Sequence, residues 1–398
     1  MPQYLKSLKQ PGAAPHIMIS AGEASGDIHG ANLFRSIKKL LPDITCSGMG
    51  GNELQRAGVN VVFDAASIAV VGASEIISHL KNILLARKMM IKEMTNNRPA
   101  LLILVDFPDF NLLLAAQAKK MGVPVFYYIS PQVWAWRTGR MKKIGLLSQR
   151  VATILPFEQD FYKQHGYTVD YVGHPLLDTV IARKNTKAVY RQYGIPGQNR
   201  CIGLLPGSRK KEIQALLPTF LEVAYMLDKR HEQPYTFLLP KASTIDLEIL
   251  EELGIHKARQ QMDIRVINDH RYDLMAACDI AIAASGTVTL ELAILETPAI
   301  VAYRVSPLTY LTGRLLIRNI DYFSLANLIV KKEIMPEFLQ HEVTAENLYQ
   351  ACDHILTIPG ERDRIVQEFR KVKKMLGETG ASKRAAAIVI EMLKAVSG

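Results

Sequence analysis

The sequence is short of cysteine and has no long apolar run. Its four cysteines stand far apart, so they do not form the closely spaced pairs of a metal site. Scattered cysteines are typical of proteins in a reducing compartment. No uncharged apolar run reaches the roughly 18 residues that a membrane span needs, and the polar N-terminus lacks the apolar core of a signal peptide. We therefore expect a cytoplasmic protein that does not cross a membrane.

Acidic residues are fewer than basic ones, and the net charge is 48 − 38 = +10. A basic protein favours anionic partners: nucleic acid, phosphorylated ligands or a membrane surface. No two aspartates are separated by a single residue, so the chain has no Asp-X-Asp metal clamp. We expect no bound metal and no cofactor. Basic residues and helix N-termini would then meet the charge of a phosphate ligand.

Short apolar runs alternate with helical patterns, which predicts parallel sheets covered by helices. A polar stretch from Asp178 to Arg200 interrupts the alternation, and the end of the chain is purely helical. We expect two doubly wound, Rossmann-like α/β domains that face a cleft, in residues 1–180 and 181–345. C-terminal helices in 346–398 could pack back on the first domain. Strands are expected at His16–Ala21, Leu101–Asp106, Val123–Ile129, Val151–Leu155, Val169–Val172, Cys201–Leu205, Tyr235–Leu239, Ile264–Ile267, Asp279–Ala283 and Ala299–Tyr303.

The loop after the first expected strand, in ISAGEASGDIHGAN, carries glycines at intervals of four: Gly22, Gly26 and Gly30. A strand that turns through glycines into a helix often binds phosphate. This spacing is not that of a dinucleotide fingerprint, and no Gly-Lys-Ser/Thr follows. The carboxylates of Glu23 and Asp27 would repel a phosphate. The loop is therefore predicted to hold a ligand other than a dinucleotide.

Two carboxylates lie at the end of the second expected strand and just after it, in LVDFPDFNL. Asp109 precedes a helical run and is a natural N-cap, whereas Asp106 sits at the strand end. In open α/β sheets ligands bind beyond the carboxyl ends of the strands. We therefore predict Asp106 to be a general base and Asp109 to be structural.

Two loops of the second domain suit a nucleotide. In LPGSRKKEI, Gly207 and Ser208 form a turn, and Arg209 would begin the next helix, where N–H groups and a guanidinium attract phosphate. A plain turn before a solvated basic helix is the alternative. In AASGTVTLELA, the segment Ser285–Gly286–Thr287 would cap a helix, and Glu291, one turn later, could accept both ribose hydroxyls. A capping box is the alternative there, but two such loops favour a nucleotide site.

Two further segments are weaker indications. SPQVWAWR contains both tryptophans of the chain, and Trp134 with Arg137 could stack on a ligand or could form a packed loop. In VGHPL, His174 could donate to a ligand or could be a turn residue.

The motifs AGEASGD, DFPDFN, SPQVWAWR, GHPL, LPGSRKKEI, SGTVTLE and SLANLIV occur in the order of the lipid-A-disaccharide synthases. From about Ile17 to the last helices the chain resembles this family. The resemblance implies a metal-independent, inverting glycosyltransferase of the two-Rossmann GT-B type. Such an enzyme joins UDP-2,3-diacylglucosamine to 2,3-diacylglucosamine 1-phosphate (lipid X), releasing UDP and forming the β-1′,6 disaccharide.

The resemblance also implies roles for residues. It makes Asp106 the essential carboxylate and Arg209 the phosphate-binding arginine, and it adds Asn327 to the UDP contacts at Ser285, Gly286, Thr287 and Glu291. Gly207 and Ser208 would join them. In the acceptor domain the glycines, including Gly26, would let an acylated sugar approach the backbone. Sugar hydroxyls would be bound by Glu23, Ser25 and Asp27, with Trp134, Arg137 and His174 as further acceptor-side residues.

SEIISHLKNILLARKMMIKEM, Ser74 to Met94, reads as one long amphipathic helix. It could lie on an anionic inner-membrane surface and guide acyl chains, or it could pack its apolar stripe on the first sheet. Apolar residues beside the main apolar stripe of this helix favour the first alternative, contact with the membrane. The predicted contacts are Ile77, Leu80, Leu84, Leu85, Arg87 and Lys88.

Other functions remain open at this point. A peptidoglycan glycosyltransferase or a UDP-N-acetylglucosamine epimerase would share the architecture, and a non-catalytic UDP-binding regulator at the membrane would share the nucleotide site. Nucleic acid is not an expected partner, and a homo-oligomer is possible.

Overall fold

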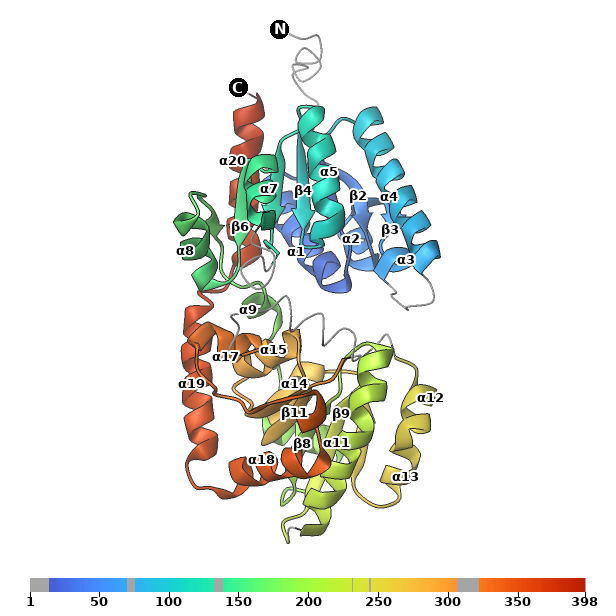
Figure 1. Cartoon of the computed structure of the whole chain (residues 1–398), viewed down its shortest axis with the longest axis vertical. Helices are drawn as coiled ribbons and strands as arrows, with labels where there is room; N and C mark the ends of the chain where they lie inside the picture. Colours follow the sequence, from blue (N-terminus) through green and yellow to red (C-terminus); the bar gives the residue numbers. More distant parts are fainter. Residues whose placement is uncertain are drawn as a thin grey trace. The chain divides into compact units, whose positions relative to one another are not determined.

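The computed structural model describes residues 14–69, 76–131, 139–230, 232–242, 245–305 and 322–397. The chain forms two compact units, shown in Figure 1. Unit 1 contains Met1–Pro175 together with Glu378–Gly398, and unit 2 contains Leu176–Gly377.

Unit 1 is built on a seven-stranded parallel sheet with the strand order β3-β2-β1-β4-β5-β6-β7. Runs such as LLILV at β4 are buried on both faces, as strands covered by helices must be. The strands are β1 (His16–Ala21), β2 (Thr45–Gly50), β3 (Asn60–Asp64), β4 (Leu101–Val105), β5 (Val125–Tyr128), β6 (Arg150–Thr153) and β7 (Asp170–Tyr171).

Helices cover both faces of this sheet. Ile17 and Ile19 of β1 pack towards α1 and α20, whereas Met18 between them packs towards α4, α5 and α7. Alternate side chains of a strand point to opposite faces, so one strand serves two cores. The helices are α1 (Ala24–Leu40), α2 (Asn52–Arg56), α3 (Ala66–Ala69), α4 (Ile76–Asn96), α5 (Pro108–Lys120), α7 (Gly139–Leu147), α8 (Pro156–Gln164) and α20 (Ala381–Ser397).

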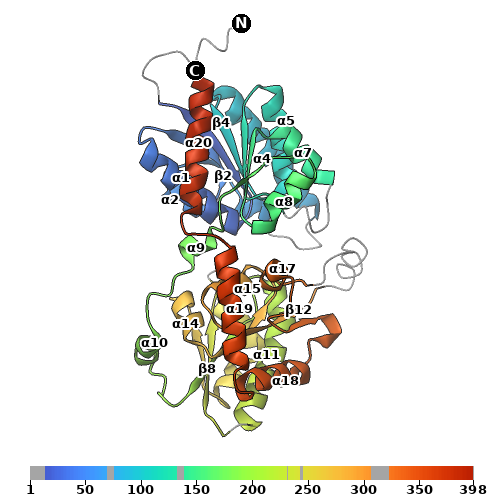
Figure 2. The same ribbon diagram turned by 90° about the vertical axis from the view of Figure 1, so that its left-hand side faces the viewer.

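The last helix, α20, belongs to unit 1, although α18 and α19 before it belong to unit 2. It lies alongside α1, as Figure 2 shows. Val389 and Leu393 are buried in the core on that face, and Arg384 Nε donates to the carbonyl of Val172 at 2.8 Å. The C-terminal helix thus completes a layer of the first sheet.

Unit 2 repeats the design with a six-stranded parallel sheet, β10-β9-β8-β11-β12-β13. Its strands are β8 (Arg200–Leu205), β9 (Tyr235–Pro240), β10 (Ile264–Ile267), β11 (Ile280–Ala284), β12 (Ala299–Tyr303) and β13 (Glu337–Leu339). Its helical segments are α9 (Leu176–Thr179), α10 (Thr186–Tyr193), α11 (Lys210–Arg230), α12 (Leu247–Leu250), η2 (Glu251–Ile255), α13 (His256–Arg259), α14 (Arg271–Ala277), α15 (Thr287–Ile294), α17 (Leu325–Val330), η3 (Gln340–Glu342), α18 (Ala345–Thr357) and α19 (Glu361–Met375).

Each sheet reverses its strand order at one place, between β1 and β4 in unit 1 and between β8 and β11 in unit 2. In doubly wound sheets ligands bind at this switch point, beyond the carboxyl ends of the two strands. The loops after these four strands carry Glu23, Asp106, Arg209 and Ser285. The four most informative motifs of the sequence therefore lie at the two switch points.

Candidate functional site

Asp106 follows β4 directly and has a left-handed backbone, with φ of 47°. Phe107, the N-cap residue of α5, is also left-handed, with φ of 46°. The Asp106 carbonyl accepts hydrogen bonds from Asn111 Nδ2 at 2.7 Å and from the Tyr127 hydroxyl at 2.8 Å, and both of these side chains are buried. Such conformations are costly for residues other than glycine and cluster at functional sites.

The carboxyl group of Asp106 is a better base than an ordinary aspartate. Burial raises its pKa to about 6, and the negative charge of Glu23 contributes in the same direction. A base works best when its pKa lies near the operating pH. Glu23 belongs to the loop after β1, which approaches the loop after β4.

Gly22 makes this approach of the two loops possible. A Cβ atom at Gly22 would lie 2.1 Å from the Phe107 ring. A Cβ at Gly26 would face the side chain of Ala21 and the carbonyl of Val105, and one at Gly30 would face Leu54. Only Gly22 is needed for close packing here, since the nearest atoms to a Cβ at Gly26 and Gly30 would lie at ordinary contact distances of 3.6 and 3.5 Å. The approach of a sugar to this loop stays a prediction.

Asp27 has a structural environment. It is 7% exposed, and its carboxylate accepts hydrogen bonds from the backbone N–H groups of Gly51, Glu53 and Leu54 at 2.8–3.1 Å. It therefore caps α2 and is not placed to bind a sugar hydroxyl. Glu23 and Ser25 are exposed at the start of α1, and the Glu23 side chain makes no capping hydrogen bond.

Asp109 is not the N-cap of α5, so that prediction is wrong. The helix starts two residues earlier than predicted, at Pro108, and a proline suits this position because the first helical residue needs no N–H donor. Asp109 lies in the first turn with its side chain exposed, and it pairs with Arg140 of α7.

In unit 2, the turn after β8 leads into α11 with Ser208 and Arg209 exposed before the helix begins at Lys210. Gly207 has φ of 110°, a conformation that side chains disfavour. The Arg209 guanidinium pairs with Glu212, one turn into α11, at 2.9 Å. The predicted turn is thus present, with the carboxylate of Glu212 beside it, and its role in binding an anion stays a prediction.

After β11, Gly286 occupies the N-cap position of α15 without a side-chain capping bond, and Ser285 and Thr287 flank it. Glu291 is buried one turn further on. Its carboxylate pairs with Arg271 and accepts from the Tyr272 hydroxyl at 3.3 Å. Burial raises the pKa of Glu291, and Arg271 and Tyr272 counteract this rise.

Arg271 and Tyr272 were missed in the sequence, although they begin the helix that follows β10. Their position after a strand was the available signal. Neither residue belongs to a sequence motif that would indicate a partner for the buried carboxylate of Glu291.

Comparison with known proteins now identifies the relationship. Residues 17–391 match the family described as lipid-A-disaccharide synthetase. The chain belongs to this family. It is 42% identical over 385 residues to the lipid-A-disaccharide synthase of Geobacter metallireducens, covering 96% of this chain and 99% of that protein. It is 45% identical over 378 residues to the one of Syntrophus aciditrophicus, covering 95% and 98%.

Solved structures agree on the architecture. UDP-GlcNAc 2-epimerase from Neisseria meningitidis, bound to UDP-GlcNAc, superposes with a TM-score of 0.63 at 12% identity, covering 96% of this chain and 100% of that one. At such identity the likeness shows the fold alone. The expected pair of Rossmann-like units of the GT-B type is confirmed, and membership of the lipid-A-disaccharide synthase family makes the chain a glycosyltransferase.

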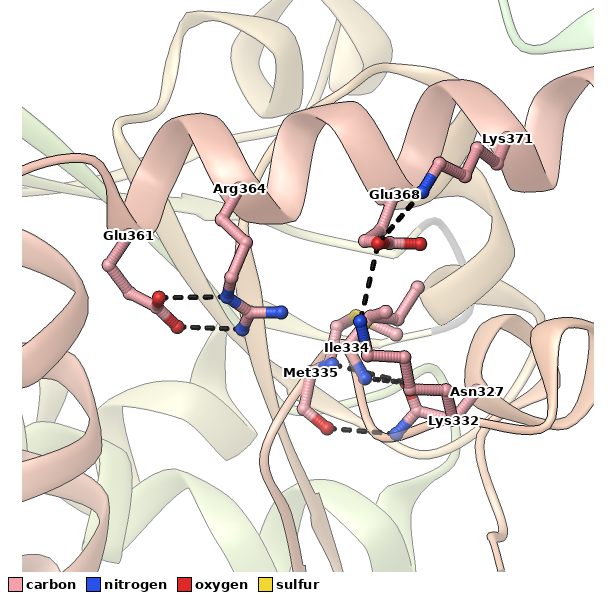
Figure 3. Close-up of polar contacts among 8 residues, drawn as sticks. All are labelled: Asn327, Lys332, Ile334, Met335, Glu361, Arg364, Glu368 and Lys371. Atoms are coloured by element: carbon pink, nitrogen blue, oxygen red, sulfur yellow. Dashed lines mark hydrogen bonds and ion pairs between the residues drawn. The ribbon is translucent and has the colours of Figure 1, made fainter.

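In this member of the lipid-A-disaccharide synthase family, the side-chain amide of Asn327 makes all its hydrogen bonds within the protein. It is 0% exposed, and its Oδ1 accepts from the N–H groups of Ile334 and Met335 at 2.9 and 3.1 Å. Its Nδ2 donates to the Met335 carbonyl and to Glu337, each at 2.8 Å. Figure 3 shows the side chain holding the Ile334–Met335 backbone. The side chain of Asn327 therefore has a structural role in place of the expected contact with UDP.

His174 is buried, and burial together with nearby His29 lowers its pKa to about 3. It is therefore uncharged near neutral pH. Trp134 and Arg137 lie outside the described residues. Within the described part of the chain, no three His, Cys, Asp or Glu residues gather where they could hold a metal ion, and no helix is long and apolar enough to cross a membrane.

Proposed function

We propose that this chain transfers 2,3-diacylglucosamine from its UDP carrier to the 6-hydroxyl of lipid X, with inversion, giving the β-1′,6 disaccharide and UDP. The observation that carries the proposal is the position of the four motif loops at the switch points of two doubly wound sheets in a lipid-A-disaccharide synthase family member. The acceptor belongs to unit 1 and the nucleotide to unit 2.

In unit 1, Asp106 takes the proton from the acceptor hydroxyl. Its raised pKa and its strained position after β4 support this role. The oxygen then attacks the anomeric carbon from the face opposite UDP, so that a single displacement converts an α-linked donor into a β-linked product. Glu23 and Ser25, exposed at the neighbouring loop, bind sugar hydroxyls.

In unit 2, Arg209 and the backbone N–H groups near Gly207 and Ser208 hold the diphosphate. The start of α15, at Ser285–Gly286–Thr287, contributes further donors. Donors that face growing negative charge stabilise the transition state more than the ground state. Glu291 accepts the ribose hydroxyls. Burial raises the pKa of its carboxyl group, and the pairing with Arg271 lowers it again, which favours the charged form that accepts hydrogen bonds.

The direct test is UDP release from UDP-2,3-diacylglucosamine in the presence and absence of lipid X. We expect release only with lipid X, together with a disaccharide product of β configuration. A UDP-sugar epimerase would act without lipid X, and a UDP-binding regulator would release nothing. Either result would contradict the proposal.

Divalent metals are not required in this mechanism, because Arg209 and the helix N-termini meet the diphosphate charge and the sequence has no Asp-X-Asp pair. We expect initial rates to be unchanged when the assay contains excess EDTA. Loss of activity with EDTA and its recovery on addition of Mg²⁺ or Mn²⁺ would show that a metal takes part.

The helix α4 is proposed to contact an anionic membrane surface while it also packs on the first sheet. Ala86, Met90 and Met94 are buried in the core of unit 1. Leu84 and Leu85 are 55% and 49% exposed, with exposed Lys88 close by in the sequence. Basic, partly apolar helices of this kind bind anionic bilayers. The side chains of Ile77 and Leu80 lie outside the described residues, and Arg87 is half-buried.

Replacing Leu84 and Leu85 together with serine should weaken binding to anionic lipid vesicles and change the melting temperature little, because both side chains are already half exposed. Vesicle co-sedimentation and thermal unfolding measure the two effects. Leu40→Ser, at the exposed end of α1, is the matched control and should leave vesicle binding intact. Unchanged vesicle binding in the double variant would remove the proposed contact.

A further inference from the structure

A carboxylate of unit 2 lies on the turn proposed to hold the diphosphate. Glu212 Oε1 pairs with Arg209 Nη1 at 2.9 Å, and Glu212 Oε2 accepts the backbone N–H of Ser208 at 3.4 Å. A Cβ atom at Gly207 would lie 2.5 Å from the same Oε2. The carboxylate therefore fills the space directly above the Gly207–Arg209 turn.

These contacts are the ones that a phosphate would make. Phosphate and carboxylate are both oxyanions that accept from a guanidinium and from N–H groups at a helix start. A glutamate in the first turn often bonds to the N–H of the cap residue, as in a capping box. Glu212 instead engages the side chain of Arg209 and the N–H of the residue before it, so it uses the ligand-binding donors themselves.

Tyr303, at the end of β12, is influenced by the charges of both Arg209 and Glu212. Burial raises the pKa of the Tyr303 hydroxyl at the end of β12, Glu212 raises it further and Arg209 lowers it. The pair itself follows the carboxyl end of β8, which is adjacent to β11, at the edge of the sheet where ligands bind.

We propose that Glu212 is an internal competitor for the nucleotide diphosphate. In the unliganded protein it neutralises Arg209, and it must rotate away before the diphosphate can occupy the turn. Its negative charge then repels the bound phosphates and favours the release of UDP. This inference rests on the proposed role of the Gly207–Arg209 turn as the diphosphate site.

The Glu212→Gln variant tests the competition, because it keeps the size of the side chain and removes its charge. We expect UDP to bind roughly two- to tenfold more tightly, since an exposed ion pair and its repulsion of the ligand are lost. UMP should gain less, and uridine, which has no phosphate, should not gain at all. Calorimetry with the three ligands gives these affinities.

Three control variants accompany it. Glu222→Gln removes an exposed negative charge further along α11 and should leave UDP affinity unchanged. Glu212→Asp, whose shorter side chain reaches the turn less well, should shift affinity in the same direction as Glu212→Gln. The double variant Arg209→Ala, Glu212→Gln should gain less over Arg209→Ala than Glu212→Gln gains over the original protein, because only the repulsion of the phosphates and the contact with the Ser208 N–H remain to be removed.

The results separate the inference from the function on which it rests. If Arg209→Ala binds UDP as well as the original protein does, the diphosphate site itself is wrong. If Arg209→Ala weakens UDP binding but Glu212→Gln does not strengthen it, only the competition is overturned. Equal changes for UDP and uridine, together with a lower melting temperature, would make Glu212 an ordinary helix cap and would also overturn it.

Discussion

Replacing Asp106 with asparagine is expected to lower turnover by about 10²–10⁴-fold while leaving UDP affinity nearly unchanged. Asparagine keeps the shape of the side chain and removes the base, and general bases contribute rate enhancements of this size. The fold should persist, because Asn111 and Tyr127 bond to the Asp106 carbonyl, and the amide oxygen of asparagine can still accept the hydrogen bond from the backbone N–H of Phe107. Steady-state rates and UDP calorimetry measure the two effects.

The matched control is Asp109→Asn. Asp109 is exposed and forms an ion pair with Arg140, and ion pairs of exposed carboxylates contribute little. Turnover within a few-fold of the original is therefore expected. Because burial raises the pKa of Asp106 to about 6, activity of the unaltered protein should fall as the pH drops through 6 and the base becomes protonated. Near-normal turnover in Asp106→Asn, or a larger loss in Asp109→Asn, would remove Asp106 from the mechanism.

Removing the guanidinium in Arg209→Ala is expected to weaken UDP binding by roughly 10- to 100-fold, as the loss of a charge-assisted hydrogen bond does. Turnover should fall by about 10²–10³-fold, because the charge on the diphosphate grows as the glycosidic bond breaks. Stability should change little, since the arginine side chain is exposed before α11 begins.

Lys211→Ala removes a neighbouring exposed positive charge and serves as the control. It should affect UDP affinity only through long-range electrostatics, so added salt should suppress its effect. Equal losses in both variants would mean that a general positive field holds the nucleotide. Intact UDP affinity in Arg209→Ala would contradict the assignment of this turn.

All ten strands expected from the sequence are present, although several boundaries differ by a residue or two. The sequence did not reveal β2, β3 or β13. The β2 segment TCSGMG contains two glycines and few of the β-branched residues that mark strands. It forms a strand because β1 and β3 pair with it on either side. Short strands of this kind depend on their neighbours more than on local propensity.

By itself the sequence determined which loops follow the strands, because apolar runs mark strands and chemical groups just after a strand lie at one edge of a parallel sheet. Asp106, Arg209 and Ser285 could be located in this way. The contacts that polar side chains make in the folded chain could not be located from the sequence. That Asp27 caps α2, that Asn327 holds the Ile334–Met335 backbone and that Glu212 covers the Arg209 turn became visible only in the folded chain. A polar side chain bonds to whichever donors the fold brings near it, whether these are a few residues away, as for Glu212, or more than twenty, as for Asp27.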